Sequence, residues 1–98
     1  MPLVQLSEKA NEDLFEIWYY IAIENNNRTA ADKFVEKLDD QFQLLAKNPH
    51  IGSSRENLSD ELRMWPVGNY GIYYTSSTGG INIIRVVEGH RDIENLFQ

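Results

Sequence analysis

The chain has 98 residues, a hydrophobic content of 42% and a net charge of −6. This length predicts a single domain, residues 1–98, with a core that needs no covalent staples. The absence of cysteine excludes disulfides and thiolate metal sites, and it is compatible with a reducing cytoplasm. Because the acidic chain lacks a cluster of Lys and Arg, specific binding of nucleic acid is not expected.

The N-terminal half predicts a strand followed by two helices. Residues 2–6 form a short alternating strand, and Ser7 can cap a helix whose apolar positions recur at helical spacing up to Ala22. The asparagine run 25–27 predicts a turn, and residues 29–32 have the form of a capping box that begins a second helix. Pro49 ends that helix, so the two helices should form an antiparallel hairpin.

Individual positions on the first helix divide between a core stripe and an acidic face. Trp18 fits the stripe, whereas Tyr19 and Tyr20 do not. The acidic side chains are expected on a solvated face that would repel nucleic acid and attract a basic partner. They are Glu12, Asp13, Glu16 and Glu24.

The C-terminal half predicts a three-stranded meander after a polar loop over residues 50–61. The strands are expected at 62–67, 70–75 and 81–87, with turns at 68–69 and 76–80. Pro66 should lie at a sheet edge or a strand end, and the β-branched strand 81–87 should be central. Residues 91–97 predict a short helical tail that docks through Ile93, Leu96 and Phe97. The expected class is α+β, with the hairpin on one face of a mostly antiparallel sheet.

Two strand arginines are the first candidate functional residues. Strict alternation puts Arg85 on one face with Ile81, Ile83 and Val87. Arg85 should then point away from the helices, beside Arg63 if the register allows, as a cationic floor for phosphate or carboxylate. The alternative is that each arginine covers its sheet or pairs with an acid.

Histidines and aromatic residues add further candidates. His90 follows a strand and precedes Arg91, where it could act as a general base, although a solvated histidine is the ordinary case. The chain has no metal-binding or nucleophile motif, so neither a metal nor another cofactor is predicted. Trp65 and Tyr73 can anchor a protein partner or simply pack across strands, and Tyr73 should face opposite to Tyr74.

Four segments together resemble the ParE toxins of the RelE/ParE superfamily. Residues 62–74 are similar to the pattern LR-x-x-PVG-x-Y-x-I-x-Y, and residues 81–97 to I-x-I-x-RV-x-x-G-x-RD-I-x-x-LF. Residues 14–22 and 30–49 are similar to the family's first and second helices. The resemblance covers nearly the whole chain in the right order, and it implies the RelE/ParE-like fold.

The resemblance also implies partners and a choice of activity. It implies a bacterial, cytoplasmic toxin in a hetero-oligomer with a ParD-like antitoxin whose tail binds between the hairpin and the sheet, a role in plasmid stabilisation, and DNA gyrase as target. Membrane association is not expected.

One alternative is a RelE-like ribosome-dependent ribonuclease acting through Arg63, Arg85, His90 and Arg91. The loop 50–61 lacks lysine and the terminus lacks tyrosine, which favours ParE. A second alternative is a non-toxic antitoxin-binding domain. The partner-binding candidates are Trp65, Tyr73, Arg63 and Arg85.

Overall fold

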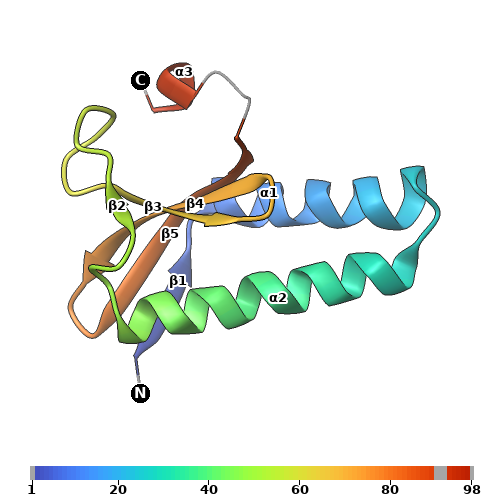
Figure 1. The fold of residues 1–98 in the computed structure, drawn as a ribbon, viewed down its shortest axis with the longest axis horizontal. Coiled ribbons are helices and arrows are strands. Elements are labelled where there is room, and N and C mark those ends of the chain that lie inside the picture. Colours follow the sequence, from blue (N-terminus) through green and yellow to red (C-terminus); the bar gives the residue numbers. More distant parts are fainter. Residues whose placement is uncertain (1, 90–92, 98) are drawn as a thin grey trace.

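A helical hairpin packs on one face of a twisted five-stranded sheet in the computed structural model, which describes residues 2–89 and 93–97 (Figure 1). The sheet order is β1-β5-β4-β3-β2, with β1 and β5 parallel and the other pairs antiparallel. The α+β class and the C-terminal meander are thereby confirmed. The elements are β1 (Leu3–Leu6), α1 (Glu8–Tyr19), η1 (Tyr20–Glu24), α2 (Arg28–Lys47), β2 (Ser53–Ser54), β3 (Arg63–Val67), β4 (Tyr70–Ser77), β5 (Gly80–Glu88) and α3 (Ile93–Leu96).

The helix ends follow the capping chemistry of their own side chains. The hydroxyl of Ser7 accepts a hydrogen bond from the Ala10 N–H at 2.9 Å, which confirms the predicted cap of α1. The predicted capping box at residues 29–32 is wrong, because α2 already begins at Arg28. Asn27 is the cap, since its backbone is non-helical and its side-chain oxygen accepts from the Ala30 N–H at 3.0 Å.

The main core lies between the hairpin and the sheet. Leu38 and Leu45 of α2 are fully buried against Ile17 of α1 and against the sheet residues Ile72 and Ile83. The helical spacing of apolar residues therefore identified most of the inner faces of α1 and α2. Trp18, expected in the core stripe, is only half-buried outside both clusters, and its Nε1 donates to the Asp32 carboxylate at 2.9 Å.

A β-bulge changes which residues of β5 share a face. Arg85 pairs with Tyr73, but Ile83 pairs with Tyr74, so Ile84 is an extra residue in β5. The predicted grouping of Ile81, Ile83, Arg85 and Val87 on one face is therefore wrong. Ile83 faces the helices, whereas Arg85 lies on the opposite face with Tyr73.

The face of the sheet opposite the hairpin carries a second apolar cluster. Tyr73 and Val87 are buried there beneath α3, on the other side of the sheet from α1 and α2 (Figure 1). Ile93, Leu96 and Phe97 pack on this cluster, as predicted, and the rings of Tyr73 and Phe97 lie 5.2 Å apart. The part of this face around Tyr73 and Val87 is therefore covered.

The edges of the sheet differ from the sequence prediction in two respects. Part of the predicted loop 50–61 forms β2, which pairs only with Arg63 and Met64. Pro66 consequently lies beyond the reach of β2, on an edge where its missing N–H leaves no gap in the ladder. The strand β5 is internal, but β4 rather than β5 is the central strand of the five.

Candidate functional site

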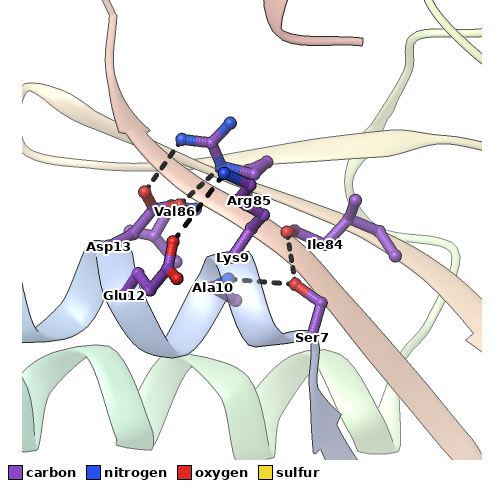
Figure 2. Close-up of polar contacts among 8 residues, drawn as sticks. All are labelled: Ser7, Lys9, Ala10, Glu12, Asp13, Ile84, Arg85 and Val86. Carbon is purple, nitrogen blue, oxygen red and sulfur yellow. Dashed lines mark hydrogen bonds and ion pairs between the residues drawn. The ribbon is translucent and has the colours of Figure 1, made fainter.

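Arg85, the first candidate cation, is held in a paired arrangement with Asp13 of α1 (Figure 2). Its Nε and Nη2 donate to Oδ2 and Oδ1 of Asp13 at 2.8 and 2.9 Å, which is the bidentate geometry that suits guanidinium and carboxylate. The Arg85 and Asp13 side chains are only 14% and 8% exposed. The hydrogen bond to Asp13 raises the pKa of Arg85 above its usual value. The expected free cationic floor is therefore wrong for Arg85, and its alternative, pairing with an acid, is correct.

This pair belongs to a side-chain cover over the edge of β5. The parallel strand β1 ends at Leu6, whereas β5 continues to Glu88. Beyond β1, the Ser7 hydroxyl donates to the Ile84 carbonyl at 2.7 Å, and the Val86 N–H donates to Asp13 Oδ2 at 2.9 Å (Figure 2). Side chains of α1 and its cap thus satisfy backbone groups that a strand would otherwise pair with. The assignment of Asp13 to a solvated face was wrong.

Arg63 lies at a different place, where it fixes the segment after α2. Its Nη1 donates to the carbonyls of Gly52 and His50 at 2.8 and 3.2 Å. The hydroxyl of Tyr74 donates to the Pro49 carbonyl and accepts from the Gly52 N–H, both at 2.9 Å. Burial raises the pKa of Tyr74, and the Gly52 N–H and the Arg63 charge offset part of that rise.

The two arginines are not neighbours. Arg63 pairs across the sheet with Tyr74, which faces the hairpin, and Arg85 pairs with Tyr73, which faces the opposite way. The bulge in β5 sets Arg85 on that second face. The two guanidinium groups are therefore held by different segments, that of Arg85 by Asp13 of α1 and that of Arg63 by the carbonyls of His50 and Gly52.

The two aromatic candidates are turned inward. Trp65 packs against the main core, and its Nε1 donates to the side chain of Gln41 at 2.8 Å. Tyr73 is only 6% exposed, and its burial raises the pKa of its hydroxyl, an effect that the charge of Arg55 partly opposes. The remaining candidates, His90 and Arg91, lie outside the described residues.

An open groove lies elsewhere, between α1–η1 and the ends of β4 and β5. This groove has a volume of about 520 Å³. Its lining combines aromatic and acidic side chains, including Tyr19, Tyr20, Glu16, Glu24 and Glu88. The sequence had indicated this region only by the misfit of Tyr19 and Tyr20 to the core stripe.

Neither a cluster of metal ligands nor a membrane-spanning helix is present in the described part of the chain. Within residues 2–89 and 93–97, no three His, Asp or Glu side chains gather as metal ligands would. None of the helices in that same part of the chain combines the length and apolar composition needed to cross a bilayer.

The arrangement of the elements matches a solved toxin–antitoxin structure, the chromosomal ParDE system from P. aeruginosa. The match has a TM-score of 0.70 at 20% identity and covers 90% of this chain and 96% of that chain. The chain therefore has the ParE-like α+β fold. More specifically, residues 4–93 match the family described as the ParE toxin of the type II toxin–antitoxin system parDE, and the chain belongs to this family. A search of curated proteins finds no match.

Proposed function

We propose that this ParE-type toxin acts by binding DNA gyrase and that a ParD-like antitoxin neutralises it in a hetero-oligomer. The observation that carries the proposal is that both strand arginines are bound within the fold, whereas an aromatic and acidic groove elsewhere on the surface is suited to protein contact. Membership of the ParE family supports gyrase as the target and an antitoxin as the partner. In this proposal the toxin acts in the bacterial cytoplasm.

The geometry gives little support to the ribonuclease alternative. Cleavage of RNA needs a cation that stabilises the developing charge and a proton acceptor within reach of the same reacting group. Arg85 is already bound in a bidentate manner by Asp13, and Arg63 is bound by two backbone carbonyls. Because each guanidinium is bound by a different segment of the fold, the structure does not bring the two together as one anion site.

Induction of the chain alone in bacteria tests this function. Two readouts are followed in parallel: a reporter of DNA-damage signalling and the 5′ ends of cellular mRNA. We expect the reporter to rise and the mRNA ends to stay unchanged, and co-induction of the antitoxin to suppress the response. New mRNA ends without DNA damage would instead establish the ribonuclease, and growth without either response would favour a non-toxic antitoxin-binding domain.

A further inference from the structure

Apolar side chains are concentrated on the outer surface of the first helix. Of the seven large hydrophobic side chains that are exposed among the described residues, four belong to α1 and η1. They are Phe15, Tyr19, Tyr20 and Ile23. None of these four belongs to either core cluster, so the fold leaves them available for contact.

Three of these side chains form a ridge along the helix. Phe15, Tyr19 and Ile23 are spaced four residues apart, which places them one above another on one side of the helix. The rings of Phe15 and Tyr19 are 6.1 Å apart. At a rise of about 1.5 Å per residue the ridge is about 12 Å long, which matches about two turns of a partner helix.

The end of α1 has an unusual backbone that presents this surface. The last turn is a π-helix over residues Tyr20–Glu24, and the Asn25 N–H donates to the Tyr20 carbonyl at 3.0 Å, five residues back. π-helical turns are rare and frequently occur at functional sites. Here the turn carries Tyr20 and Glu24 at the groove and Ile23 at the end of the ridge.

The charge of the groove defines what can occupy it. Glu16, Glu24 and Glu88 line it, and no Lys or Arg of the described chain forms an ion pair with any of the three. A second copy of this chain would bring the same carboxylates against them and would be repelled. A segment that carries Arg or Lys would be attracted, and carboxylates offer guanidinium groups a bidentate contact.

We propose that the ridge and the groove together form the docking site for a short amphipathic helical segment of the antitoxin. Its aliphatic side chains cover Phe15, Tyr19 and Ile23, and Arg or Lys on its flank enters the groove beside Glu16 and Glu24. This inference rests on the proposed function, because it assumes an antitoxin partner, and it deepens that function by naming the surface and the chemistry of the bound segment.

Calorimetric titration with the purified antitoxin encoded beside the toxin gene tests the docking site. The first variant, Tyr19→Ser, removes the middle of the ridge, and the second, Glu16→Gln with Glu24→Gln, removes charge but keeps shape. Matched controls are Leu44→Ser and Glu36→Gln, which change exposed residues of the same kinds on α2. All altered positions are exposed, so melting temperatures should stay close to wild type and confirm folding.

The expected outcome is specific to each variant. Tyr19→Ser should weaken antitoxin binding by about tenfold or more, as the loss of an aromatic anchor does. The double glutamine variant should weaken binding by about threefold to tenfold and reduce its dependence on salt, because the lost contacts are between charges. The α2 controls should bind within about twofold of wild type, as is usual for residues outside an interface.

Failures of the two proposals are distinguishable. Wild-type affinity in both the ridge and the charge variants, with intact antitoxin binding, would overturn the docking site but leave the antitoxin partner standing. Loss of affinity in the ridge variant alone, with an unchanged salt dependence in the charge variant, would overturn the basic character of the segment. If the wild-type toxin did not bind its antitoxin, the proposed function itself would be refuted.

Discussion

Replacement of Asp13 by alanine should destabilise the fold strongly, although sequence periodicity assigns this residue to a solvated surface. The substitution removes the acceptor for two Arg85 donors and for the Val86 N–H, at 2.8 to 2.9 Å. Loss of one partner of a buried ion pair costs about 3–5 kcal/mol, because the other charge is left uncompensated. Since the Arg85 side chain keeps 14% exposure and can turn toward water, we expect the lower end, about 3 kcal/mol.

Urea unfolding followed by circular dichroism measures this loss. Asp13→Asn keeps an acceptor for the Val86 N–H but not the charge, so its cost should be about 1–2 kcal/mol. The matched control is Glu12→Ala on the same helix, where the pair with Lys9 is long, at 3.8 Å, and exposed. That control should change the free energy of unfolding by less than about 0.5 kcal/mol. Equal stabilities of the Asp13→Ala and Glu12→Ala proteins, with unchanged urea dependence, would refute the edge-covering role of Asp13.

Three further substitutions and one pH titration examine the rest of the fold. Leu38→Ala empties a fully buried site and should cost about 2–5 kcal/mol in chemical unfolding; a loss under about 0.5 kcal/mol would contradict its place in the core. Tyr74→Phe removes the hydroxyl between Pro49 and Gly52 and should cost about 1–3 kcal/mol in the same assay. Gly52→Ala should lower the melting temperature, because an added Cβ would collide with the Tyr74 ring, and a wild-type melting temperature would argue against that close approach. Burial raises the pKa of Tyr74 above 10.0, so the folded state retains its proton longer than the unfolded state. The contribution of the Tyr74 hydroxyl to the free energy of unfolding should therefore be fully present below pH 10 and be lost as the pH rises above it. Tyr74→Phe should make the fall in stability at high pH less steep.

Local chemistry made much of the fold predictable. The cap at Ser7, the apolar stripe that includes Leu38, and the turn at Gly68 each depend on a few neighbouring residues. Gly68 has a φ of +58°, which a two-residue hairpin commonly requires at its first central position. The similarity of ordered segments to the ParE pattern also identified the family, which the match over residues 4–93 confirms.

The predicted arginine site failed for reasons that a periodic pattern cannot contain. The bulge at Ile84 reverses alternation, yet apolar residues lie on both faces of β5, so the sequence gives no sign of the extra residue. The pair between Asp13 and Arg85 joins residues far apart in the chain, and it arises because β1 stops before β5 does. Likewise, the covering of Tyr73 depends on the docking of Phe97 over the second face.

The measurement that tests the central claim most directly uses purified, antitoxin-free toxin in two parallel assays. One contains DNA gyrase and relaxed plasmid, and the other contains translating ribosomes with a defined message. The account predicts that the toxin blocks supercoiling or traps gyrase on cut DNA, while the message stays intact. Cleavage of the message in the ribosomal A site, with gyrase unaffected, would contradict it. Loss of that cleavage in a folded Arg85→Ala variant would then assign Arg85 to stabilisation of transition-state charge.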